Sequence, residues 1–246
     1  MTYCVAMLLD TGLVFLADSR TNAGVDQVNT FRKTSVFVRA GERVIVLQVA
    51  GNLSVCQSVI NLLHDDIAAG DDRRNLMNCG NFFEIAGMVG SAIRRVSDRD
   101  ADSLHKFGIE FNPAITVGGQ IHGEPPRLFN IYAPGNFIEA TPETTYFQIG
   151  ESKYGKPIID RVIRRSSSLT DAIKCALVSM DSTIRSNLSV GPPLDLVIVR
   201  RDALRVARHT SIDANNAYFS SISSGWSEAL RHAFVQLPDH DWLGGR

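Results

Sequence analysis

The fold is decided by the first eighteen residues of the chain, which read MTYCVAMLLDTGLVFLAD (residues 1–18). Two apolar, β-rich runs at 2–9 and 13–17 flank the turn pair Thr11-Gly12. Strands joined by so short a turn form an antiparallel hairpin. We therefore expect Asp18, which ends the second run, to lie close to Thr2, which begins the first.

The spacing of apolar residues along the rest of the chain predicts an order of strands, two helices, strands, two helices, strands and a helix. The expected elements are strands at 2–9, 13–17, 34–39 and 43–50, helices at 53–69 and 82–96, strands at 107–111, 114–121, 127–133 and 146–149, helices at 157–164 and 169–184, strands at 195–199 and 204–207, and a helix at 216–235. We expect the charged stretch 98–102 to be a loop, and the serines at 166–168 to supply a helix N-cap.

Hairpin-linked strands that alternate with helix pairs predict an α+β fold, a four-layer αββα sandwich of two antiparallel sheets. No Pro/Gly/Ser-rich linker interrupts the order. We expect a single domain over residues 1–246, with about residues 243–246 as a flexible tail.

Composition narrows the class of protein. The 246 residues are 44% hydrophobic and 21% charged, and 25 basic against 26 acidic residues give a net charge of −1. This balance excludes the basic surface that nucleic acid requires, and no run of about eighteen apolar residues predicts a membrane span. Four isolated cysteines and no signal peptide predict a cytoplasmic, reduced protein without a zinc site or other cofactor.

Thr2 is the first candidate for chemistry. Methionine aminopeptidases remove Met1 when a small residue follows, and removal leaves Thr2 with a free α-amine beside its own hydroxyl. A threonine hydroxyl needs a base, and an α-amine with a pKa of about 7.7 to 8.0 is partly neutral near pH 7. One residue can thus supply nucleophile and base, although many chains begin Met-Thr without catalysis.

Two charged residues support that candidate. Asp18 ends the second predicted strand, and Lys33 precedes the strand at 34–39. A lysine beside the nucleophile lowers the pKa of the hydroxyl and the amine, and an aspartate keeps that lysine charged and oriented. Each alone is an ordinary strand-end charge; their combination with Thr2 carries the interpretation.

Together these residues resemble the superfamily of proteasome β-subunits and HslV, which are N-terminal nucleophile (Ntn) hydrolases. The resemblance covers nearly the whole chain, and within the superfamily it is greatest to Anbu, the bacterial proteasome-related family. The motifs that carry it are MTYCVA at 1–6, DSRTNAGVD at 18–26, VAGNL at 49–53, MDSTIRSN at 180–187 and SNLSVGPP at 186–193. They are specific in combination and weak one by one.

The resemblance implies a threonine-type peptidase. Thr2 would be the nucleophile with its own amine as base, Lys33 would tune its pKa, and Asp18 would orient Lys33. The backbone N–H of Gly51 would stabilise the oxyanion, an interaction worth about 2.7 to 4 kcal/mol where one such donor has been removed.

Three further residues complete the implied catalytic set. The family has a serine directly after a glycine here, whereas this chain has Gly150, Glu151 and then Ser152. We assign the supporting role to Ser152, with Glu151 as the alternative. Asp181 and Ser186 would form hydrogen bonds around the Thr2 amine.

The resemblance also implies a substrate side lined by Thr21, Asn22, Val49 and Leu53, in which a backbone-binding groove lies beside an apolar pocket. An equally supported interpretation is that Val49 and Leu53 are simply residues of the hydrophobic core. In relatives, carbonyls at the positions of Met180, Thr183 and Ser186 hold a structural cation, so these residues are candidates here.

The implied partners are further copies of the same chain, in a ring-like or helical homo-oligomer, and a peptide or protein substrate. No nucleic-acid or membrane partner is expected, and the sequence names no ATPase partner. The alternative function is a non-proteolytic structural subunit or a specialised Ntn amidase. Cys4, an alternative nucleophile, lies among apolar strand residues and is expected to be a buried structural thiol.

Overall fold

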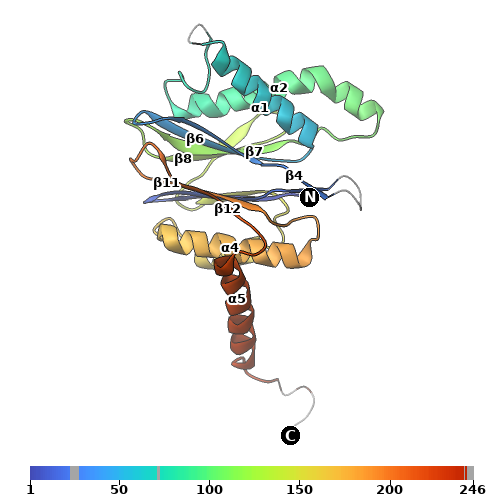
Figure 1. Cartoon of the computed structure of the whole chain (residues 1–246), viewed down its shortest axis with the longest axis vertical. Helices are drawn as coiled ribbons and strands as arrows, with labels where there is room; N and C mark the ends of the chain where they lie inside the picture. The colour runs from blue at the N-terminus through green and yellow to red at the C-terminus, as the bar shows by residue number, and fades with distance from the viewer. Residues whose placement is uncertain (23–27, 71–72, 241, 243–246) are drawn as a thin grey trace.

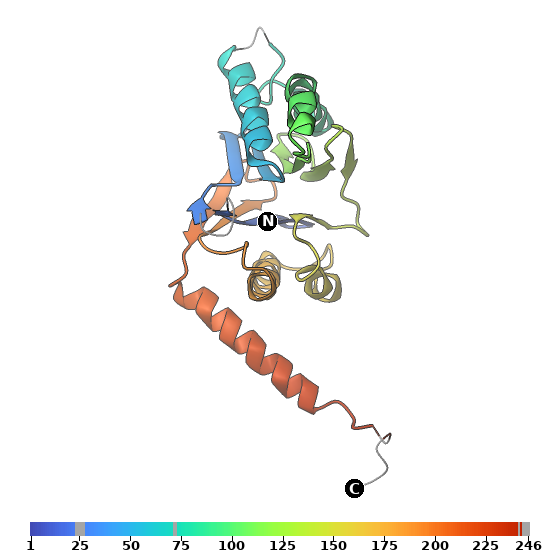
Figure 2. The same ribbon diagram turned by 90° about the vertical axis from the view of Figure 1, so that its right-hand side faces the viewer.

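Two five-stranded antiparallel sheets lie face to face, and helices cover the outer face of each (Figures 1 and 2). This computed structural model describes residues 1–22, 28–70, 73–240 and 242. The expected four-layer αββα sandwich is confirmed. The tail expected at about 243–246 lies outside the described residues, as do residues 23–26 of the DSRTNAGVD motif.

The first sheet contains the opening hairpin at its centre. Its strands, in spatial order, are β10 (Tyr146–Gly150), β1 (Tyr3–Leu9), β2 (Gly12–Asp18), β11 (Leu194–Arg200) and β12 (Val206–Ile212). Its outer face packs against α3 (Lys156–Val162) and α4 (Leu169–Ser186). Helix α4 begins at the expected N-cap, because Ser168 Oγ accepts the Asp171 N–H at 3.0 Å.

The second sheet follows the same plan. Its strands are β5 (Thr34–Arg39), β6 (Arg43–Ala50), β7 (Ala114–Ile121), β8 (Arg127–Ile131) and β9 (Phe137–Glu139). It lies under α1 (Leu53–Ala68) and α2 (Phe82–Lys106). Two short strands, β3 (Arg20–Asn22) and β4 (Val28–Thr30), form a separate ribbon after β2.

The opening runs are continuously apolar because β1 and β2 are buried on both faces. Ala6 and Leu8 of β1 pack between the two sheets, whereas Met7 and Leu9 pack under the helices. Strand β1 pairs with β2 in a register that places Cys4 opposite Ala17. The predicted hairpin is therefore confirmed, and the end of β2 lies at the start of β1.

Helix α2 differs from the prediction. It continues to Lys106, so the loop expected at 98–102 and the strand expected at 107–111 are both wrong. The charged stretch lies on the solvent side of the helix, while Leu104 still packs on the core. Gly108, with a φ of +69°, then turns the chain in the left-handed conformation that ends many helices.

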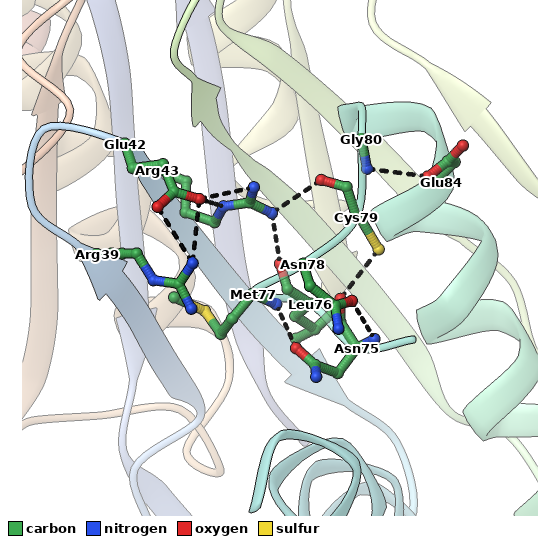
Figure 3. Close-up of polar contacts among 10 residues, drawn as sticks. All are labelled: Arg39, Glu42, Arg43, Asn75, Leu76, Met77, Asn78, Cys79, Gly80 and Glu84. Atoms are coloured by element: carbon green, nitrogen blue, oxygen red, sulfur yellow. Dashed lines mark hydrogen bonds and ion pairs between the residues drawn. The ribbon is translucent and has the colours of Figure 1, made fainter. Parts of the chain in front are cut away.

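The segment between α1 and α2 is held by a buried arginine (Figure 3). Arg43 Nη1 donates to the carbonyls of Leu76 at 3.1 Å and Cys79 at 3.0 Å. Glu42 neutralises the guanidinium from the other side, with 2.9 Å between Arg43 Nη2 and Glu42 Oε1. This contact joins the start of β6 to the entry of α2.

The last helix, α5 (Ala217–Val235), projects away from the sandwich (Figures 1 and 2). Phe219 is its one buried residue within the described part of the chain. Leu230 and Phe234, four residues apart on one face, are 50% and 75% exposed. The expected helix at 216–235 is confirmed, but its position outside the body is not something the sequence indicated. Across the described residues, no helix combines the length and apolarity needed to cross a membrane.

Candidate functional site

The start of β1 and the end of β2 hold a buried ion pair. Lys33 Nζ donates to Asp18 Oδ1 at 2.7 Å and to the Arg20 carbonyl at 2.7 Å. The Tyr3 N–H donates to the same Asp18 oxygen at 3.0 Å. The side chains of Asp18 and Lys33 are 0% and 3% exposed. The hairpin register therefore brings Asp18 to the residue that follows Thr2, as the sequence predicted.

The electrostatics of Asp18 reflect two opposed effects. Burial raises the pKa of the Asp18 carboxyl above its ordinary value, because desolvation disfavours the charged form. The Lys33 ammonium and the Tyr3 N–H act in the opposite direction, and burial outweighs them. Asp18 thus fixes Lys33 in place through a contact that solvent does not weaken.

Thr2 lies between two depressions that meet at Gly51. The first, which we call the apolar pocket, has a volume of about 440 Å³ and is lined by Thr2, Thr21, Asn29, Thr30, Phe31, Lys33, Val49, Ala50, Gly51, Leu53 and Cys56. The second, which we call the Glu110 groove, has a volume of about 580 Å³ and is lined by Thr2, Ala50, Gly51, Asn52, Ile109, Glu110, Asn112, Ala114 and Gly150. Met1, which is 64% exposed, lines both.

Gly51 has a conformation that only glycine adopts readily. Its φ is +104°, and a Cβ atom there would lie 2.1 Å from the Asn112 carbonyl oxygen. The Asn112 side chain also accepts the Asn52 N–H at 3.0 Å. No acceptor was found for the Gly51 N–H across residues 1–22, 28–70, 73–240 and 242. That donor is therefore free for a ligand beside Thr2.

Three of the four expected substrate-binding residues lie on the apolar pocket. Thr21, Val49 and Leu53 all line it. Val49 is 4% exposed and also belongs to the core under α1, so its position suits both interpretations, and its role in substrate binding stays a prediction. Leu53, 36% exposed at the start of α1, presents part of its surface to the pocket. Asn22 is the last residue of β3, and its side chain lies outside the described part of the chain.

The structure brings Glu151, and not Ser152, to Thr2. The Glu151 N–H donates to the Thr2 carbonyl at 2.6 Å. The Glu151 side chain is buried and accepts the Asn187 Nδ2 at 3.2 Å. Ser152 instead lines a different depression, together with Tyr146 and Asp160. The choice of Ser152 over Glu151 therefore has no support in the geometry, because the one-residue offset turns Ser152 away from the Thr2 depressions.

No hydrogen bond from Asp181 or Ser186 to Thr2 was found among the described residues, so their role at the amine stays a prediction. Asp181 Oδ2 accepts a hydrogen bond from Arg185 Nε at 3.1 Å, one turn along α4. Ser186 is exposed at the end of that helix. The next residue, Asn187, is linked to the N-terminus, because its side chain donates to Glu151 and the Glu151 N–H donates to Thr2. The position of Asn187 at the end of the MDSTIRSN motif was the feature of the sequence that could have indicated this link.

The candidate cation ligands lie at the C-terminal half of α4. Met180 and Thr183 are buried, and the Thr183 carbonyl accepts the Asn187 N–H at 2.8 Å. A cation held by these carbonyls would share that oxygen with the helix cap, so this site stays a prediction. No cluster of three or more His, Cys, Asp or Glu side chains suited to a metal ion was found over the described residues.

Three residues beside Thr2 were not predicted from the sequence to belong to the site. Ile109, Glu110 and Asn112 line the Glu110 groove, whereas the sequence predicted a strand at 107–111. Gly108, which follows the charged stretch 98–102 by six residues, was the indication of a helix end. Cys4 behaves as expected: it is 0% exposed, and burial raises the pKa of its thiol, which keeps it protonated and unreactive.

Solved structures of Anbu proteins are similar to the chain over almost its whole length. Anbu (ancestral beta-subunit) from Yersinia bercovieri is 50% identical with a TM-score of 0.91, over 99% of this chain and 100% of that one. The Anbu (Gly-1) mutant from Hyphomicrobium sp. strain MC1 is 47% identical with a TM-score of 0.92, over 98% and 100%. The helical assembly of the Anbu complex from Pseudomonas aeruginosa is 47% identical with a TM-score of 0.93, over 99% and 100%. A scan against protein-family models and a search of curated proteins gave no match.

Proposed function

Because this chain belongs to the Anbu family of proteasome-related proteins, we propose that it is a threonine-type Ntn hydrolase subunit. In this proposal it hydrolyses peptide or amide bonds with Thr2 as nucleophile after the loss of Met1. The observation that carries the proposal is the buried Lys33, held at 2.7 Å by both Asp18 and the Arg20 carbonyl, on the wall of the pocket that Thr2 also lines.

The residues divide the chemistry as follows. The Thr2 α-amine takes the hydroxyl proton as Oγ attacks the substrate carbonyl, and the positive charge of Lys33 lowers the cost of forming the alkoxide. The carbonyl oxygen becomes an oxyanion, and the free Gly51 N–H donates to it. The protonated amine then gives its proton to the leaving amine as the carbon–nitrogen bond breaks. Water hydrolyses the remaining Thr2 ester and restores the hydroxyl.

Met1 controls this mechanism. While Met1 is attached, the free α-amine of the chain belongs to Met1 and not to Thr2. Met1 also lines both depressions beside Thr2. Its removal places the amine on Thr2 and takes away a side chain that lines both depressions. Processing therefore supplies the base and clears the site in one step.

We extend the proposal to self-association. The exposed apolar face of α5, formed by Leu230 and Phe234, lacks a covering element among the described residues, and the exposed Leu237 follows the end of the helix. A second copy of the chain is the occupant that we propose for it, because the relative from Pseudomonas aeruginosa forms a helical assembly. Substrates would then reach Thr2 within an oligomer.

The buried Glu151 favours a second candidate, a structural subunit or a specialised Ntn amidase. A carboxylate stands where the family resemblance leads to a serine, which alters the proton path around the amine. Profiling peptide mixtures with the processed protein and with Thr2→Ala decides between the candidates. Peptide cleavage that Thr2→Ala abolishes supports the peptidase. Full processing with identical product profiles for both proteins contradicts it.

A further inference from the structure

The wall of the Glu110 groove also borders a second depression. This depression, of about 710 Å³, shares Ile109, Glu110 and Asn112 with the groove and continues to Asp102 and His105 near the end of α2. Ile109, Glu110 and Asn112 therefore border both depressions. Away from Thr2, the apolar pocket is lined by different side chains from those of the Glu110 groove. The two depressions can therefore hold the parts of a substrate on opposite sides of the reacting bond.

The wall of this groove is fixed at both ends. The Ile109 N–H donates to the Leu104 carbonyl at 3.0 Å, which ties the segment to the last turn of α2. At the other end, Asn112 packs its carbonyl on Gly51 and accepts the Asn52 N–H. A wall held in this way can select among substrates, because it need not be ordered when one binds.

Glu110 gives the groove its charge. Among the described side chains that line the depression at Thr2, it is the one that carries a formal charge. It is exposed, and no salt bridge to it, or to Asp102 further along, was found in the described structure. The apolar pocket has the opposite character, since Lys33 is buried in its wall.

We propose that the Glu110 groove is a substrate subsite on the far side of the reacting bond from the apolar pocket, where Glu110 selects a lysine or arginine side chain. This inference rests on the proposed function of Thr2 and adds a preference that the nucleophile alone does not give. An exposed carboxylate gains only a modest energy from such a pair, so the preference is about 2- to 5-fold and weakens as salt screens it.

The first arm of the test measures cleavage. Peptide series that differ only in Lys, Gln or Glu at positions on either side of the reacting bond are compared by kcat/KM. The proteins are the processed wild type, Glu110→Gln, Glu110→Lys and Glu143→Gln, the last being a matched exposed carboxylate in another depression. We expect the wild type and Glu143→Gln to prefer Lys on one side only. Glu110→Gln loses that preference and Glu110→Lys reverses it.

The second arm measures binding without chemistry. Fluorescence anisotropy of the same peptides is recorded with Thr2→Ala and with Thr2→Ala carrying Glu110→Gln. Charge-dependent binding that needs Glu110, combined with a fully processed wild type that cleaves none of the peptides, supports the groove and overturns the proposed hydrolysis. Cleavage with equal rates for Lys, Gln and Glu in all proteins overturns the groove and leaves the hydrolysis standing. Neither cleavage nor charge-dependent binding overturns both.

Discussion

Lys33 and Asp18 lie almost fully buried at the N-terminus, where each is the charge partner of the other. Removing one partner of such a pair leaves an uncompensated charge and costs about 3 to 5 kcal/mol. We expect Lys33→Met to lower the free energy of unfolding at neutral pH by an amount in that range. Urea denaturation monitored by circular dichroism measures it.

The pH dependence of that loss has a definite sign. The pKa of Asp18 in the folded protein already lies above its ordinary value because of burial, and loss of the Lys33 charge moves it further up. The folded variant then takes up a proton at a pH where the unfolded chain does not, so acid stabilises it relative to the wild type. The stability gap should therefore narrow as the pH falls from 7.5 toward 5. A gap that widens over this range contradicts the account.

Gly51 provides a second test at the scale of one residue. An alanine there combines an unfavourable φ of +104° with a Cβ atom 2.1 Å from the Asn112 carbonyl oxygen. We expect Gly51→Ala to destabilise the fold by about 1 to 3 kcal/mol and to abolish hydrolysis, since the donor to the oxyanion moves. Gly123→Ala is the control, because Gly123 has a φ of +83° and no atom within 4 Å of the added Cβ. Equal effects of the two substitutions on melting temperature would rule out the clash.

The sequence allowed the prediction of residues that depend on local geometry. Thr2 and Asp18 are joined by one hairpin, and its register follows from two apolar runs and a tight turn. The supporting role assigned to Ser152 stays a prediction, while the backbone contact with Thr2 is made by Glu151. Which of these two adjacent residues faces the N-terminus depends on how β10 ends against β1. Gly150 there has a φ of +82°, and a Cβ on it would meet the Thr2 carbonyl at 2.1 Å.

At the scale of elements, Arg43 links β6 to the segment before α2. Its two hydrogen bonds to the carbonyls of Leu76 and Cys79 are charge-assisted, and each such bond contributes about 1.5 to 3 kcal/mol. We expect Arg43→Met to speed amide hydrogen exchange in residues 73–81 far more than in β1. Arg39→Met is the control, because Arg39 also pairs with Glu42 but is exposed. Equal exchange rates in the two variants would show that Arg43 does not hold this segment.

Helix α2 shows where periodicity fails. Its first half has apolar residues at helical spacing, and the sequence predicted it correctly. Its second half is mostly charged, because it faces solvent and needs only occasional core contacts such as Leu104. The apolar residues that follow resembled a strand, yet Phe107 is 82% exposed. The groove residues were missed for that reason.

At the scale of the whole molecule, the four-layer sandwich was predictable because each buried strand and each amphipathic helix carries its own pattern. The direction of α5 was not predictable, because its pattern of apolar residues suits either a helix that packs on the sandwich or a helix that another chain covers. The helix lies away from the sandwich (Figure 2), and no element within the described part of the chain covers its apolar residues Leu230 and Phe234.

The proposed self-association makes α5 testable. We expect Phe234→Asp to reduce the assembly to smaller species, because it places a charge in the apolar face. His232→Asp is the control on a neighbouring exposed position of the same helix. Analytical ultracentrifugation measures the distribution of species. Assemblies of equal size in both variants and the wild type would exclude this face as the contact.

The central claim is that Thr2 becomes the nucleophile when Met1 is lost, and one measurement tests it most directly. The purified protein is treated with a threonine-directed covalent inhibitor, and its intact mass and N-terminal peptide are determined by mass spectrometry. The account predicts loss of Met1 and an adduct on Thr2, with no adduct on Thr2→Ala and a slower reaction for Lys33→Met. A fully processed protein whose Thr2 stays unmodified would contradict it.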